Sequence, residues 1–120
     1  MFVCVDSLVA VVLELTSLGR SGEALRILES KKGIFQLNGQ IADLHLHDRQ
    51  TLESYFAAAG LVDLDCRGLL VTMSAMGREW CSQAIASDRA AFLDLERAYS
   101  RFPAIADAGK HIILSGRRPL

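Results

Sequence analysis

The sequence predicts a mainly helical α+β domain with a small antiparallel sheet of two or three short strands. Apolar residues recur at helical spacing from 7 to 30 and again from 49 to 59. After Gly60 the period changes to two, because residues 61–65 alternate apolar and acidic side chains. A length of 120 residues suffices for one domain with a sizeable core that needs no disulfide or metal.

The first two elements are expected to be helices. Residues 7–18 are long enough for a helix, Ser7 can cap it and Gly19 can stop it. Almost every face of this helix is apolar, so we expect the domain to cover one side and a second subunit the other. Ser21 caps a second predicted helix over 22–30, which has one apolar and one charged stripe.

The middle of the chain is expected to alternate short strands and helices. Residues 34–37 are predicted to form a strand that pairs with later strands, and Asn38 to cap a helix over 39–46. Asp48 caps a further helix over 49–59, whose apolar residues recur at helical spacing. Residues 61–73 then predict two short strands joined by a turn at 66–68.

The last part is read as one long helix over 75–102, followed by an extension. Pro103 begins the new segment, in which 104–108 suits a turn of helix, 112–114 either a strand or an anchor, and 116–118 a mobile basic end. Within the helix, apolar residues repeat as in a two-helix seam. This seam can pack on the N-terminal helix, on a second subunit, or on both.

The order of elements from Asn38 to Trp80 resembles the winged helix-turn-helix family of DNA-binding transcriptional regulators, especially its PadR-like and MarR-like groups. The resemblance rests on four pieces: Ile41-Ala42, Asp48 to Leu52 where the family has a capped recognition helix, Ala59 to Val62, and Ser74 to Trp80 after the wing. It implies a winged-helix domain over 1–102, with a motif core over 21–80 and extra N- and C-terminal helices, and a partly mobile C-terminal extension over 103–120. Residues 44–47 depart from the family, which usually has a glycine in this turn.

The resemblance also implies a DNA-binding surface. The helix over 49–59 would enter the major groove of double-stranded DNA, and the wing over 61–73 would lie near the backbone or minor groove. Arginine, glutamine and glutamate side chains suit base edges. The expected base-reading residues are Arg49, Gln50, Glu53 and Ser54, and the expected backbone contacts are Lys31, Lys32, Arg67 and Arg78.

A homodimer is expected from the apolar N-terminal helix and the C-terminal seam, and an apolar fraction of 51% fits a buried surface between subunits. The expected interface residues are Leu8, Val12, Leu15, Ile85, Phe92, Leu95 and Tyr99. Three scattered cysteines without a C-x-x-C pair indicate reduced thiols in a cytoplasmic protein, and the minority interpretation is that Cys66 is a redox sensor. No apolar run fits a signal peptide or a membrane span.

Neither catalysis nor a metal site is expected, because no catalytic motif is present and His45 and His47 lack a third ligand. No cofactor is expected either. The net charge of −1 gives the chain no overall basic field, and acidic residues flank Arg67. These two observations favour an alternative function, a winged-helix protein-interaction module (adaptor, inhibitor or assembly subunit) that does not bind DNA.

Overall fold

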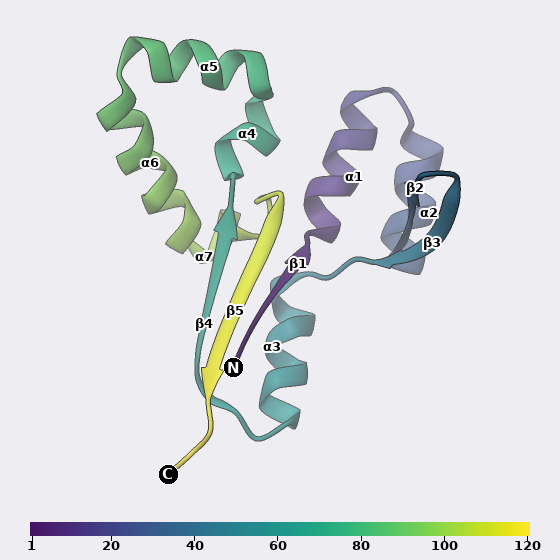
Figure 1. Ribbon diagram of the computed structural model, residues 1–120, viewed down its shortest axis with the longest axis vertical. Coiled ribbons are helices and arrows are strands. Elements are labelled where there is room, and N and C mark those ends of the chain that lie inside the picture. Colours follow the sequence, from purple (N-terminus) through teal and green to yellow (C-terminus); the bar gives the residue numbers. More distant parts are fainter.

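A computed structural model describes residues 1–120 (Figure 1). Helices hold 52% of the residues and strands 28%, which confirms the α+β class and gives more sheet than the small wing that was predicted. The elements follow one another as β1 (Phe2–Asp6), α1 (Leu8–Ser17), α2 (Ser21–Ser30), β2 (Lys32–Leu37), β3 (Gln40–His45), α3 (Arg49–Ala58), β4 (Val62–Leu69), α4 (Val71–Met76), α5 (Arg78–Ser87), α6 (Arg89–Arg101), α7 (Pro103–Ala106) and β5 (His111–Arg117).

The centre of the fold is a three-stranded antiparallel sheet in the order β1-β5-β4. Ile112 and Leu114 of β5 point to one face and are fully buried, while Ile113 between them faces the other way. α3 covers the buried face with Leu52 and Phe56, and Leu61 completes this core. No helix in the structure has the length and apolarity needed to cross a bilayer.

The expectation of a C-terminal extension over 103–120 is wrong, because β5 is the central strand of the sheet. Three consecutive apolar residues, Ile112 to Leu114, hide the period of two in the sequence. The strand interpretation of residues 112–114 is the correct one, but both neighbours of β5 come from far earlier in the chain, so no local signal places it at the centre of the sheet.

The two predicted N-terminal helices are confirmed as α1 and α2, which lie side by side and antiparallel (Figure 1). Ser7 caps α1 by accepting a hydrogen bond from the Ala10 backbone N–H at 3.2 Å. The turn between the helices contains Gly19, whose φ of +74° suits glycine. Leu8, Ala10 and Leu15 of α1 are buried.

The predicted helix over 39–46 is wrong: these residues form β3, which pairs with β2 in a separate two-stranded hairpin. Asn38 and Gly39 both have positive φ, 51° and 78°, as a two-residue type I′ turn requires, so Asn38 is a turn residue and no helix cap. The strand predicted over 34–37 is present, but its partner is β3 and it does not join the wing strands. Consequently α3 has no helix directly before it in the chain.

The predicted wing over 61–73 is also wrong, since residues 62–69 form one strand, β4. Its pairing with β5 shifts between Val62 and Asp65, so the strand is irregular near its start. Gly68 does not turn the chain but pairs with Ile112 of the central strand. The helix predicted over 49–59 is confirmed as α3.

The long helix predicted over 75–102 is divided into α4, α5 and α6. Gly77, at φ +86°, separates α4 from α5, and Asp88 ends α5 and caps α6 through the Ala91 backbone N–H at 3.0 Å. Glu96 of α6 folds back onto α4, where its carboxylate accepts from the backbone N–H groups of Val71 at 2.5 Å and Thr72 at 3.1 Å. This contact satisfies the start of a helix that has no side-chain cap of its own.

Candidate interaction surface

The outer face of α3 presents only part of the predicted base-reading set. Arg49 and Glu53 are about one-third exposed and form an ion pair along the helix at 3.3 Å. Gln50 and Ser54 are exposed, and the Ser54 hydroxyl donates to the Thr51 carbonyl at 2.7 Å. Arg49, which was expected to read bases, is therefore paired with a residue of its own helix.

The start of α3 is fixed from two sides. Asp48 accepts from the Thr51 N–H at 2.7 Å, and Asp107 accepts from the Arg49 backbone N–H at 2.7 Å. Burial of Asp48 opposes its ionisation, but the hydrogen bonds from Thr51 and the positive charge of Lys31 outweigh it and lower the pKa of the carboxyl. These carboxylates stabilise the positive end of the helix dipole and hold the helix against the sheet.

The predicted backbone-contacting cations lie on separate elements. Lys31 follows α2 in the left-handed conformation, Lys32 begins β2, and Arg78 begins α5. Arg67 pairs with Asp65 at 2.9 Å and lies in register with Ile113, whose side chain faces away from α3. The structure therefore does not gather these cations around the outer face of α3.

The predicted dimer interface does not form one surface. Leu8 and Leu15 are buried inside the chain, so they are not available to a second subunit. Ile85 lies on α5, while Phe92, Leu95 and Tyr99 lie on α6 beyond the break at Asp88. Leu95 and Tyr99 line an apolar groove of about 400 Å³, whose other residues are Val71, Thr72, Ala75, Met76, Trp80, Ile105 and Ala108.

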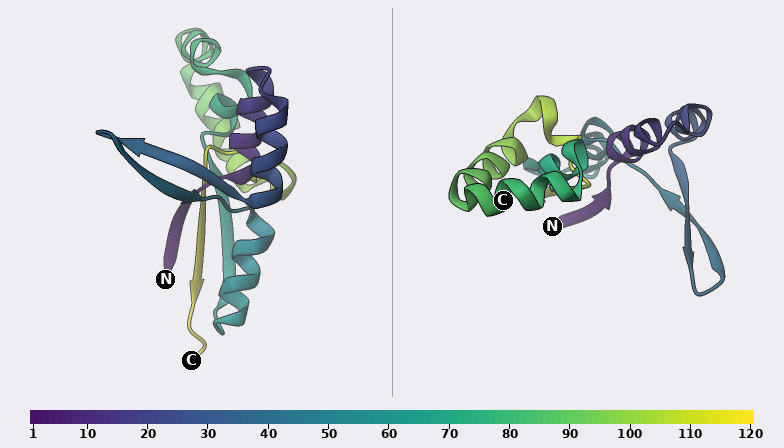
Figure 2. Two further views of the ribbon diagram at one scale, coloured as in Figure 1. Left: turned by 90° about the vertical axis from the view of Figure 1, so that its right-hand side faces the viewer. Right: turned by 90° about the horizontal axis from the view of Figure 1, so that it is seen from above.

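The hairpin of β2 and β3, residues 32–45, exposes several large apolar side chains and is called the hairpin arm below. In Figure 2 it projects away from the helices and the sheet, on the side opposite α3. Ile34 and Ile41 are 73% and 70% exposed, and Phe35 and Leu37 are 51% and 57% exposed. An isolated two-stranded hairpin is marginally stable in water, so this arm needs a covering surface.

The two faces of the hairpin arm differ. Phe35 pairs with Ala42, and Leu37 and Leu44 lie on the same face two residues further along their strands, so that face is apolar apart from Gln40 at the tip. The opposite face mixes Ile34 and Ile41 with charged and amide side chains.

Sequence reasoning missed the arm, although Asn38-Gly39 between two apolar runs is a strong hairpin signal.

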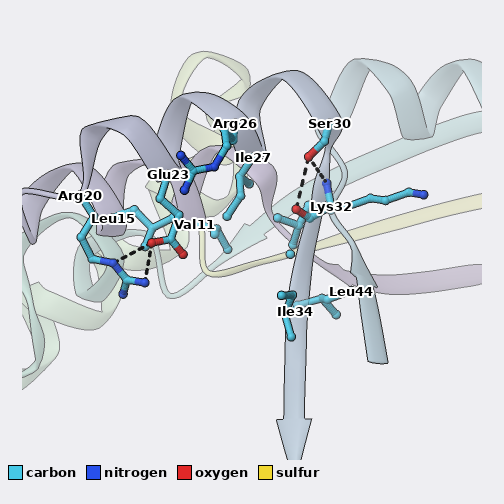
Figure 3. A pocket seen from close by; sticks show the side chains of 12 residues that line it. Val11, Leu15, Arg20, Glu23, Arg26, Ile27, Ser30, Lys32, Ile34 and Leu44 are labelled. Carbon is cyan, nitrogen blue, oxygen red and sulfur yellow. Dashed lines mark hydrogen bonds and ion pairs between the residues drawn. The ribbon is translucent and has the colours of Figure 1, made fainter. Parts of the chain in front are cut away.

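A groove of about 560 Å³ lies where the hairpin arm meets α1 and α2 (Figure 3). Its lining combines an apolar floor with a charged rim. The floor is formed by Val11, Leu15, Ile27, Ile34, Leu44 and Leu46, and Arg20, Glu23, Arg26 and Lys32 lie around it. Figure 3 shows Arg20 paired with Glu23, which leaves Arg26 and Lys32 as further cations at the groove.

The cysteines give no support to the minority interpretation of a thiol sensor. Cys66 is half-buried, and burial, together with the nearby carboxylates of Glu53 and Asp107, raises its pKa to about 11. Burial and Glu96 also raise the pKa of Cys81. Both thiols are therefore protonated at neutral pH, the unreactive form.

The chain exposes more surface than its size requires. Its accessible area is 8218 Å², whereas a folded monomer of 13.1 kDa exposes about 6,400 Å². Its radius of gyration is 15.8 Å, against about 13.6 Å for a typical domain of this length.

No protein-family model and no curated protein matches the sequence.

Proposed function

We propose that the protein is a protein-interaction module, an adaptor or assembly subunit that works through its hairpin arm. The observation that carries the proposal is the arm itself, because residues 34–42 contain no charged side chain and present Phe35 and Leu37 to water. Monomeric proteins protect exposed strands with charged residues, prolines or covering elements. An uncharged apolar hairpin that projects from a domain is suited to association with another protein.

Electrostatics support the same function. The net charge is −1, and the cations of the groove are partly neutralised by Glu23. Arg67 and Arg49 are each paired with a carboxylate. DNA binding depends on several cations that neutralise phosphates together, and here they lie on separate elements.

Photo-cross-linking in cells tests the proposal. A benzoylphenylalanine in place of Phe35 should give a discrete cross-linked protein band, and the same group in place of Gln83, an exposed residue of α5, should not. Equal labelling patterns from both positions, or no product from Phe35, would contradict a role for the hairpin arm.

Sequence-specific DNA binding as a dimeric regulator is the second candidate function. It is favoured by α3, a capped helix with the expected bounds whose outer face exposes Gln50 and Ser54. A titration of a random duplex between about 50 and 200 mM salt separates the candidates, because phosphate contacts make affinity fall steeply with salt. Salt-dependent binding that is weakened by Gln50→Ala on a preferred site would replace the proposal made above.

A further inference from the structure

We propose that the partner of the hairpin arm is a second copy of this chain, and that two arms pack antiparallel about a two-fold axis. Each arm tip then lies in the groove at the base of the other arm. This inference rests on the proposed function and adds the identity of the partner and the geometry of the contact. It replaces the predicted interface on the first and last helices with a different surface.

The first argument is the area that a partner has to cover. The accessible surface of 8218 Å² exceeds that of a folded monomer of the same mass by about 1,800 Å². A standard interface buries about 800 Å² on each partner, and obligate dimers bury more. One large contact with a copy of equal size removes this excess from both chains at once.

The second argument is that the arm and the groove complement each other. The tip of the arm carries Leu37 and Ile41, both more than half exposed, and has no charge that the apolar floor of the groove would have to desolvate. The amide side chains of Gln36 and Gln40, at the same tip, are acceptors for the cations at the groove. Apolar and polar parts of the tip therefore both find matching groups.

The third argument is symmetry. Each strand of the arm has six residues, a length of about 20 Å. When two arms of equal length pack antiparallel, each tip necessarily reaches the base of the other arm, which is where the groove lies. A two-fold axis uses every contact twice, so one tip and one groove per chain give a closed dimer.

Analytical ultracentrifugation of the full chain at low micromolar concentration tests the proposal. The parent protein should sediment as a dimer, at twice the protomer mass of 13.1 kDa. Leu37→Glu should raise the dimer dissociation constant by about 100-fold or more, because it places a charge in the apolar contact twice per dimer. Leu93→Glu is the matched control: it makes the same substitution at an exposed leucine of α6, an element that contributes to neither the arm nor the groove, and should leave the dimer intact.

A cross-linking experiment on otherwise unmodified arms tests the geometry and does not depend on the folding of Leu37→Glu. Chains with Asn38→Cys at the tip are mixed with chains with Lys32→Cys at the base, both in a Cys4→Ser background that removes the exposed native thiol. A short bismaleimide should join one chain of each kind. Tip-to-tip products, or no product, would overturn the antiparallel arrangement.

Two outcomes separate this inference from the proposed function. If the parent protein is monomeric but its Phe35 position cross-links to a different protein in cells, the proposed self-association is wrong and the proposed interaction module remains supported. A dimer that Leu37→Glu and Leu93→Glu affect equally overturns the arm contact. A monomer with no cross-link from Phe35 and with salt-dependent DNA binding refutes both proposals.

Discussion

Replacing Gly68 by alanine distinguishes the observed strand from the predicted wing turn. Gly68 lies in β4, where the backbone of α7 passes directly over it. A Cβ at this position would overlap the carbonyl oxygen of Ala106 and lie 2.9 Å from its Cα. Non-bonded carbons normally lie about 3.5–4.0 Å apart, so the two backbones would have to separate by at least about 0.6 Å.

The cost follows from what has to move. The obstructing atoms belong to the backbone, and the Ala106 carbonyl also accepts the Gly109 N–H at 3.0 Å, so no side chain can rotate away. Overpacking typically costs about 1–3 kcal/mol, and a rigid neighbour places Gly68→Ala near 3 kcal/mol. In urea unfolding followed by circular dichroism, this loss should lower the midpoint by about 1–3 M.

Gly60→Ala is the control, measured at the same protomer concentration. Gly60 has a φ of +78° but nothing within 4 Å of an added Cβ, so alanine meets only backbone strain, about 1–2 kcal/mol. If residues 66–68 formed a wing turn, Gly68→Ala would find open space as well. A midpoint shift for Gly68→Ala no larger than that for Gly60→Ala would refute the assignment of β4 as a strand beneath α7.

Three further predictions concern two helix-capping carboxylates and the native thiols. Asp48→Ala should cost about 1 kcal/mol at neutral pH by removing the cap of α3, and Asp48→Asn should cost much less. Since the pKa of Asp48 is lowered in the folded state, its ionised side chain stabilises the fold above the unfolded pKa, and this stabilisation is lost as the pH falls below about 4. The melting temperatures of the parent and the Asp48→Ala variant should therefore become equal as the pH is lowered through this range. Alkylation by iodoacetamide at pH 8 should label exposed Cys4 quickly and Cys66 slowly, and equally fast labelling of Cys66 would contradict its raised pKa. Glu96→Ala should cost about 2 kcal/mol in urea unfolding, because the first N–H groups of α4 lose a charged acceptor.

The sequence by itself determined the elements whose signals are local. Local signals located α1, α2 and α3 to within about two residues. These signals are the caps Ser7 and Asp48, the glycines 19 and 60 after helix ends, and apolar residues at helical spacing. The Asn38-Gly39 turn signal was equally local, but Asn38 was interpreted as a helix cap, so β3 was predicted as a helix.

Only the tertiary structure decided which strands pair and which surfaces stay open. β5 became the central strand because β1 and β4, from distant parts of the chain, supply its hydrogen-bond partners and α3 covers its buried face. The structure pairs Arg49 with Glu53 on the same helix, and it buries Leu8 and Leu15, which were expected at a dimer interface. Such contacts join residues far apart in sequence, so they depend on the packing of the whole chain, whereas caps and turns depend on a few neighbouring residues.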